Sequence, residues 1–290
     1  MFKNLNQRTT GIILVLVSAV VFSTAGIFTR AVSAGAWDII FWRGLFAVCF
    51  TLAYTAWRGT FKSEFFNMGK SGIAAASVGA SGTAAYIPAF KLTTIANVSL
   101  LYAATPLLAA FIAWWWMGER ATKVVLIAGL VTLLGVAIVV SGSIGGVHIK
   151  GDLLACWMAI AMAIGFVIYR KYPTTPAAGP SALSSLLLFP WALAFGKPFS
   201  DALPEILTMI GFGLVFAIAS ITLSEGAKRL PAGETSLLSV LEVVMAPLLA
   251  WAAFSEVPAL ASFVGGAMIL AAVIASQVLA EPTKIIGEDK

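Results

Sequence analysis

Charged residues, histidine and cysteine are all scarce in this sequence. Asp, Glu, Lys and Arg make up 11% of its 290 residues, whereas soluble domains carry about 25%. There is one His, and the two cysteines, Cys49 and Cys156, both lie inside apolar runs. This pattern offers no ligand spacing for a metal and no disulfide framework, and no Gly-rich phosphate loop occurs at a strand–helix junction. We therefore expect neither a metal site nor a cofactor, and an enzyme is the weaker interpretation.

Apolar residues are what the sequence has in excess. They account for 60% of the chain, and the mean hydropathy is +0.97. A core of this size cannot hide so much apolar surface, so lipid must be the solvent for most of it. The 18 Lys and Arg give a net charge of +5, but they are scattered in ones and twos. No basic patch forms, which argues against a nucleic-acid partner.

Ten apolar stretches are long enough to cross a hydrocarbon core of about 30 Å. They cover residues 11–32, 37–57, 70–90, 93–117, 122–141, 152–169, 181–197, 204–224, 234–255 and 258–280. The first resembles a signal peptide, but its apolar part is too long for one, so we expect an uncleaved helix. The sequence predicts an all-α membrane protein with ten transmembrane helices in a single domain, residues 1–290, and no soluble domain.

The basic residues predict the orientation of these helices. Placing both termini in the cytoplasm puts 13 Lys and Arg on the cytoplasmic side and four outside, with Arg43 within a span. An excess of Lys and Arg near the cytoplasmic ends of spans is the rule for membrane proteins. We expect a multi-pass protein of the cell inner membrane with both termini cytoplasmic.

One apolar stretch is repeated within the chain. Residues 99–119 read SLLYAATPLLAAFIAWWWMGE and residues 236–256 read SLLSVLEVVMAPLLAWAAFSE, with seven identities at an offset of 137. A weaker match at an offset of 140 pairs Gly11 with Gly151 and Arg30 with Arg170. The copies lie in the fourth and ninth spans, with four spans between them, so they cross in opposite directions. The sequence predicts two inverted five-helix repeats, residues 1–141 and 142–290, a signature of secondary transporters.

Several motifs resemble those of a known family. The FWRG of residues 41–44, the MGER of residues 117–120 after a Pro-bearing helix, and the ten spans in a 5+5 repeat resemble the EamA family of the drug/metabolite transporter superfamily. The resemblance covers essentially the whole chain and implies an inner-membrane exporter of small metabolites with a central cavity. Within the family, the YddG-like amino-acid exporters are the nearest comparison, although no motif marks that branch. Val243 follows Glu242 where the family commonly has Pro, and Pro247 comes one turn later.

Polar and aromatic side chains within the spans are candidates for the wall of a substrate cavity. They are Trp42, Ser81, Tyr86, Tyr102, Trp157, Ser239 and Glu242. Tyr102 falls about 15 Å into its span, near the midplane, and Ser239 is its repeat partner. We expect residues 93–117 and 234–255 to face one cavity. There Tyr102 and Trp157 would contact an apolar side chain, and Glu242 with Ser239 would receive an ammonium group, or Glu242 would carry a proton. Packing is the alternative role for each residue.

Two prolines and three charged residues are the remaining candidates for a functional role. Pro106 and Pro247 lie in the repeated spans, where an interior Pro bends a helix, so we expect gating hinges or static kinks. Arg43 is expected to snorkel outward or to meet Asp38. Glu119 and Glu256 close the two copies on opposite faces of the membrane, where they would pin helix ends or close gates.

The lining argues for the substrate class. The first span has no acidic residue, which weakens the case for cationic drugs as substrates. The spans contain few basic residues, which weakens the case for phosphorylated compounds. We expect a monomer, in contact with the bilayer and a small-molecule substrate, that exports amino acids, including aromatic or other apolar ones. A multidrug or other neutral-metabolite exporter is the alternative, and a membrane enzyme or structural protein is less well supported. The sequence leaves open whether export is coupled to protons or is facilitated diffusion.

Overall fold

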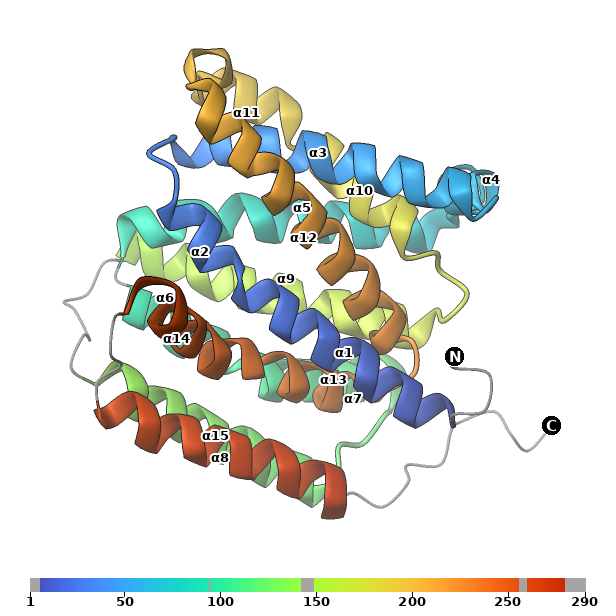
Figure 1. The fold of residues 1–290 in the computed structure, drawn as a ribbon. Coiled ribbons are helices and arrows are strands. Elements are labelled where there is room, and N and C mark those ends of the chain that lie inside the picture. Colours follow the sequence, from blue (N-terminus) through green and yellow to red (C-terminus); the bar gives the residue numbers. More distant parts are fainter. Residues whose placement is uncertain (1–5, 94, 142–148, 256–259, 280–290) are drawn as a thin grey trace.

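The computed structural model describes residues 6–93, 95–141, 149–255 and 260–279, and within these ranges it contains helices and no strands (Figure 1). The predicted all-helical class is therefore confirmed. In chain order the elements are α1 (Gln7–Ser23), α2 (Ala25–Arg30), α3 (Ala36–Trp57), α4 (Phe61–Phe65), α5 (Gly69–Leu92), α6 (Ile95–Tyr102), α7 (Thr105–Met117), α8 (Lys123–Val140), α9 (Ile149–Lys171), α10 (Ala178–Leu186), α11 (Phe189–Phe195), η1 (Pro198–Ser200), α12 (Leu203–Ala227), α13 (Ala232–Ser239), α14 (Leu241–Phe254) and α15 (Leu260–Leu279).

Eight helical segments of the described chain are long and apolar enough to cross a membrane. They are Ala36–Trp57, Asn97–Met117, Lys123–Val140, Ile149–Lys171, Ala178–Phe195, Leu203–Ala227, Ala232–Ala253 and Leu260–Leu279. The other two predicted stretches, 11–32 and 70–90, correspond to α1 with α2 and to α5, which run through the bundle beside these eight (Figure 1).

Several of these segments consist of two helices separated by a short break. The break between α6 and α7 has a direct cause, because Pro106 in the first turn of α7 has no N–H to donate to the carbonyl of Tyr102, four residues earlier. The Thr105 hydroxyl donates to that carbonyl instead, at 2.5 Å. In the second copy the chain breaks at Val240, between α13 and α14, whereas Pro247 lies inside α14. The two candidate hinges therefore occupy different places in their helices.

The two sequence copies adopt the same local structure. At the offset of 137 residues, α6 (Ile95–Tyr102) corresponds end for end to α13 (Ala232–Ser239), and α7 and α14 end at matching positions. Both copies also finish on a left-handed residue, Gly118 with φ of 70° and Ser255 with φ of 56°. Such a φ is uncommon for a residue other than Gly. The duplication thus extends from sequence to helix ends and caps.

Small residues allow the helices to pack closely. The most extensive pairings are α5 with α9, α8 with α15, and α12 with both α1 and α3. Between α8 and α15 a Cβ on Gly135 would lie 2.9 Å from the Gly265 carbonyl oxygen, so the backbones meet where neither residue has a side chain. Close approach at small residues is a common basis of helix association in lipid.

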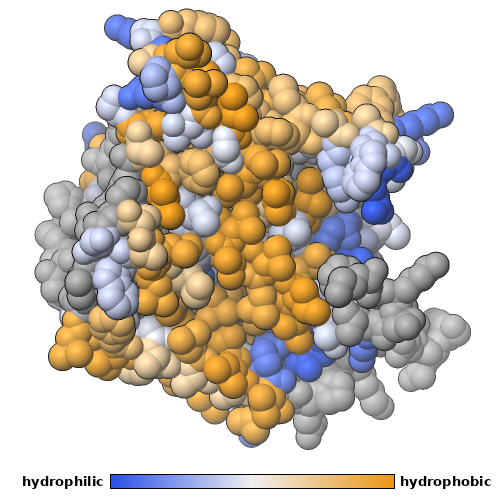
Figure 2. Space-filling model, viewed as in Figure 1, coloured by the Kyte–Doolittle hydropathy of each residue, from blue (hydrophilic) through white to orange (hydrophobic). Residues whose placement is uncertain are grey.

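The outside of the bundle is largely apolar. Large apolar side chains are exposed along several helices, among them Phe111, Trp115, Leu134, Leu153, Ile274 and Val278. Figure 2 shows a broad hydrophobic surface across the helices, with hydrophilic residues gathered toward the two ends of the bundle. A surface of this kind is costly in water and matches a bilayer.

Candidate functional site

The structure brings Tyr102 and Glu242 together inside the bundle. Tyr102 is the last residue of α6 and Glu242 lies in the first turn of α14, so both side chains sit at breaks in their helices. The side chains of the two residues hydrogen-bond to each other. Tyr102 is buried and Glu242 is partly buried. A carboxylate within a span needs a partner or a wet cavity, and a phenol of the other copy provides the partner here.

Tyr86 and Arg43 extend this pair toward α5 and α3. The Tyr86 side chain is 39% exposed and lies close enough to both Glu242 and Arg43 to interact electrostatically with each. The four residues Arg43, Tyr86, Tyr102 and Glu242 therefore form one polar cluster, which we call the central cluster. Its members come from α3, α5, α6 and α14.

Arg43 adopts neither of the arrangements expected for it. Its side chain is buried, and the guanidinium carbon lies 4.1 Å from the ring centroid of Phe216 and 5.5 Å from that of Phe212, both on α12. The Asp38 carboxylate accepts a hydrogen bond from the backbone N–H of Lys197 at 2.5 Å. The expected pairing of Arg43 with Asp38 is therefore wrong, because Asp38 joins α3 to the segment after α11.

The hydroxyl groups of Ser239 and Ser81 donate within their own helices. Ser239 donates to the carbonyl of Thr235 at 2.8 Å, and Ser81 donates to the carbonyl of Val78 at 2.9 Å. Serine in a helix commonly bonds back to the preceding turn in this way. Ser239 is buried and Ser81 is partly buried, and the lone pairs of both hydroxyl oxygens remain available as acceptors.

The two candidate tryptophans lie in different surroundings. The Trp42 indole N–H donates to the carbonyl of Pro198 at 2.9 Å, and its ring packs against Phe41, Phe46 and Phe199. Trp42 therefore belongs to an aromatic group that contacts η1. Trp157 on α9 exposes 46% of its side chain.

Glu119, two residues after the end of α7, accepts hydrogen bonds from two other helices. The Arg170 Nε at the end of α9 donates to its carboxylate at 2.7 Å, and the Ala232 N–H at the start of α13 donates to its other oxygen at 3.3 Å. A carboxylate at a helix N-terminus is also favoured by the helix dipole. Its counterpart Glu256 lies outside the described residues.

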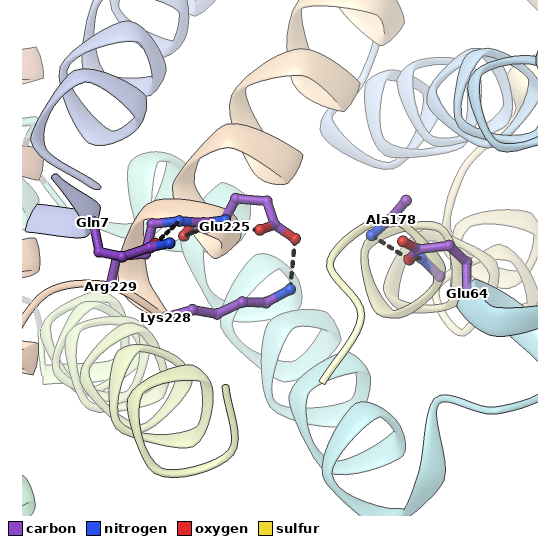
Figure 3. A network of polar contacts seen from close by, with 7 residues as sticks. Gln7, Glu64, Ala178, Glu225, Lys228 and Arg229 are labelled. Atoms are coloured by element: carbon purple, nitrogen blue, oxygen red, sulfur yellow. Dashed lines mark hydrogen bonds and ion pairs between the residues drawn. The ribbon is translucent and has the colours of Figure 1, made fainter. Parts of the chain in front are cut away.

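Further charged contacts lie at the same end of the bundle, where α1 begins and α15 ends (Figure 1). Arg8 donates to Glu234 at 3.2 Å. Figure 3 shows two further groups of contacts. In one, Glu225 accepts from Lys228 at 2.5 Å and pairs with Arg229. In the other, Glu64 accepts from the backbone N–H of Ala178 at 2.9 Å. Sequence reasoning missed these roles because each charge, taken alone, resembles an ordinary span-end residue.

At the opposite end of the bundle a carboxylate also joins two helices, but its hydrogen-bond donors are uncharged side chains. Asp152 near the start of α9 accepts from the Thr93 hydroxyl at 2.6 Å and from the Asn97 amide at 3.1 Å. Asn97 is the repeat position of Glu234, since the two are 137 residues apart. Equivalent positions of α6 and α13 thus both contact the helix that packs beside them.

An apolar cavity of about 150 Å³ lies between α8, α14 and α15, and its lining includes Val244, Pro247, Phe263 and Gly266. None of the four central-cluster residues lines this cavity. Within the described ranges no three His, Cys, Asp or Glu side chains are placed to share a metal ion. What the central cluster offers is a carboxylate, a guanidinium and two phenols, which bind polar groups through charge and hydrogen bonds.

Comparison with known proteins adds a family and a fold. The model of a family described as "EamA-like transporter family" matches residues 9–141 and again residues 149–276. An "Uncharacterized transporter" of Archaeoglobus fulgidus is 26% identical over 266 residues, covering 90% of this chain and 93% of the relative. A solved structure described as "Crystal structure of protein" superposes with a TM-score of 0.82 at 20% identity, over 94% of this chain and 98% of that one.

Proposed function

The chain belongs to the EamA-like transporter family of the drug/metabolite transporter superfamily, and from this we propose that it exports amino acids with aromatic or other apolar side chains. It is a membrane protein with many apolar helices. We place it in the cell inner membrane with both termini cytoplasmic, an orientation that the distribution of Lys and Arg supports.

The observation that carries the substrate proposal is the contact between Tyr102 and Glu242. Both residues lie at helix breaks in the repeated segments, and transporter sites are commonly built at such breaks near the midplane. A carboxylate beside phenol rings suits an ammonium group next to an apolar side chain. The central cluster also contains a cation, which a site for simple organic cations would not need.

Two inverted five-helix halves, residues 1–141 and 142–290, are the architecture that we propose for transport. The family model matches each half separately, and the helix ends of α6 and α13 correspond at the sequence offset. Two similar halves can rock against each other and open a central site to either side of the membrane. Alternating access of this kind requires contacts between the halves that break and re-form.

The charged contacts at the end where α1 begins are suited to that role. Glu119 belongs to the first half, and its partners Arg170 and Ala232 belong to the second. Arg8 and Glu234 also join the two halves. We propose that these contacts close the cytoplasmic end in the conformation seen here and separate when the site opens inward.

Pro106 and Pro247 are the proposed points of bending. Pro106 lies in the first turn after a break, and Pro247 lines the apolar cavity between α8, α14 and α15. A missing backbone hydrogen bond lowers the cost of bending at each Pro. The cavity beside Pro247 gives α14 space to move.

The deciding experiment is a substrate panel with purified protein in proteoliposomes, with and without an imposed pH gradient. We expect saturable transport of apolar and aromatic L-amino acids. Transport of drugs or neutral metabolites without amino acids would favour the alternative exporter and overturn our proposal. A dependence of the rate on the imposed gradient would identify proton coupling, and its absence would identify facilitated diffusion.

A further inference from the structure

We infer that Arg43 binds the carboxylate of the transported zwitterion, opposite the Glu242 carboxylate that receives its ammonium group. This inference rests on the proposed function, because it names the second charge that an amino-acid site needs. It gives Arg43 a direct role in substrate binding, where the sequence alone pointed to a structural one.

The first support is the burial of Arg43 within the apolar part of the bundle. Its side chain is 7% exposed, and it lies seven residues into α3, about 10 Å below the start of the helix at 1.5 Å per residue. A guanidinium does not lose its proton under ordinary conditions. A buried cation inside a membrane span must therefore be paired, or must face water or a ligand.

The second support is that the guanidinium has no anion beside it within the described residues. Its Nε is buried without a hydrogen-bond partner, and no described carboxylate lies within ion-pair distance. Phe216 and Phe212 provide ring faces, which attract a cation but accept no hydrogen bond in the way that a carboxylate does. The planar donors of Arg match the two oxygens of a carboxylate.

The third support is the position of Arg43 relative to Glu242. Tyr86 interacts electrostatically with both, yet Arg43 and Glu242 form no ion pair with each other. Two opposite charges thus lie around one partly exposed phenol without neutralising each other. A substrate with a carboxylate and an ammonium group can bridge them, whereas a simple amine or a simple acid would leave one of them unpaired.

The packing of α3 against α12 includes a backbone contact that does not involve the guanidinium. A Cβ on Gly213 would lie 2.8 Å from the backbone nitrogen of Ala47 and 3.0 Å from the carbonyl oxygen of Arg43. The two helices therefore meet through their backbones at Gly213. Replacement of the Arg43 side chain leaves this contact in place, so a variant can report on binding as well as on folding.

The test compares two probes that differ at the carboxyl end. L-phenylalanine carries a carboxylate, and L-phenylalaninamide has the same side chain and ammonium group with an uncharged amide. Wild-type protein and Arg43→Gln are reconstituted, and the apparent KM of each probe is measured. Because charge-assisted hydrogen bonds are the stronger kind, we expect Arg43→Gln to raise the KM for phenylalanine about tenfold or more. The KM for phenylalaninamide should change little.

Control variants separate binding from folding. Arg58→Gln removes the Arg whose side chain lies over Tyr54, at the end of the same helix, and should leave the preference for phenylalanine unchanged. Arg43→Lys keeps a charge without the planar donors and should fall between the wild type and Arg43→Gln. If Arg43→Gln does not fold, competition between the two probes in the wild-type protein measures the same preference without a mutation.

The outcomes distinguish this inference from the proposed function. If wild-type protein transports phenylalanine and Arg43→Gln keeps its full preference over the amide, the inference is wrong while the proposed function stands. In the wild-type competition, equal affinity for the two probes would also overturn it. If the wild type transports no amino acid, the proposed function fails, and the role of Arg43 in zwitterion binding fails with it.

Discussion

Glu119 and Arg170 are 51 residues apart in the sequence, yet the Arg170 Nε lies 2.7 Å from the Glu119 carboxylate at one end of the bundle. Glu119 closes the first copy of the repeat, and Arg170 lies in the last turn of α9, in the proposed second half. The same carboxylate accepts from the first N–H of α13. One side chain thus joins the two proposed halves and caps the helix that leads to the central cluster.

This contact should be energetically coupled. In a double-mutant cycle with Glu119→Gln and Arg170→Gln, we expect a coupling free energy of at least about 1 kcal/mol, because both side chains are largely buried. Reversible unfolding in mixed micelles measures it. The pair Glu225–Lys228, three residues apart at the C-terminal end of α12, is the control and should couple by no more than about 0.5 kcal/mol. Equal coupling in the two cycles would contradict a special role for Glu119.

Removal of the charge at Glu242 should impair transport. Glu242→Gln keeps the shape of the side chain, and we expect it to lower the initial rate for a zwitterion about tenfold or more, since a charge-assisted contact is lost. The rate is measured in proteoliposomes and normalised to inserted protein. Wild-type transport at normal expression would show that the carboxylate is a buried structural group.

Tyr102→Phe should have a smaller effect than Glu242→Gln, because it removes one hydrogen bond and no charge. We expect a loss of about three- to tenfold in transport rate. Tyr54→Phe, at an exposed position on α3, is the matched control and should be unchanged. An effect of Tyr54→Phe as large as that of Tyr102→Phe would mean that the assay reports stability instead of the site.

The two prolines should affect movement more than binding. Replacing Pro106 or Pro247 with Ala restores a backbone N–H and stiffens the helix, so we expect slower transport with nearly unchanged substrate affinity. Rates in proteoliposomes and equilibrium binding in detergent separate the two quantities. Unchanged transport in both variants would make the prolines passive kinks.

Stability should depend on pH through Asp201, which lies outside the spans. Burial and the nearby Asp38 carboxylate raise the pKa of Asp201 above its ordinary value of 3.8. The folded protein therefore binds this proton more tightly than the unfolded chain, and stability falls as pH rises from 3.8 through the raised pKa. We expect Asp201→Asn to raise the melting temperature at neutral pH and to lose that advantage below pH 3.8. A melting temperature that Asp201→Asn leaves unchanged at both pH values would contradict this.

The orientation can be tested with single cysteines. In a background without Cys49 and Cys156, a cysteine at the exposed position of Lys197 should react with an impermeant reagent from outside the cell. A cysteine at Lys62, also exposed, should react after permeabilisation. The reverse pattern would overturn the proposed topology.

The sequence by itself determined the class of this protein and its family, and it predicted a duplication. Composition excludes a water-soluble fold because the apolar surface exceeds what 290 residues can bury. The positions of the helices follow from lengths of apolar sequence. The repeated sequence of residues 99–119 and 236–256 identifies two segments, and in the structure the helix ends of these segments lie at corresponding positions. These properties depend on local sequence and on the solvent.

The tertiary structure decided which charges meet. Arg43 lies over Phe216 on α12 and not beside Asp38, five residues away, because the packing of α3 on α12 sets its direction. Glu119 finds its partners on α9 and α13, which no local pattern indicates. Side-chain pairing inside a membrane depends on which helix faces are adjacent, and in lipid many apolar faces are equally acceptable as neighbours.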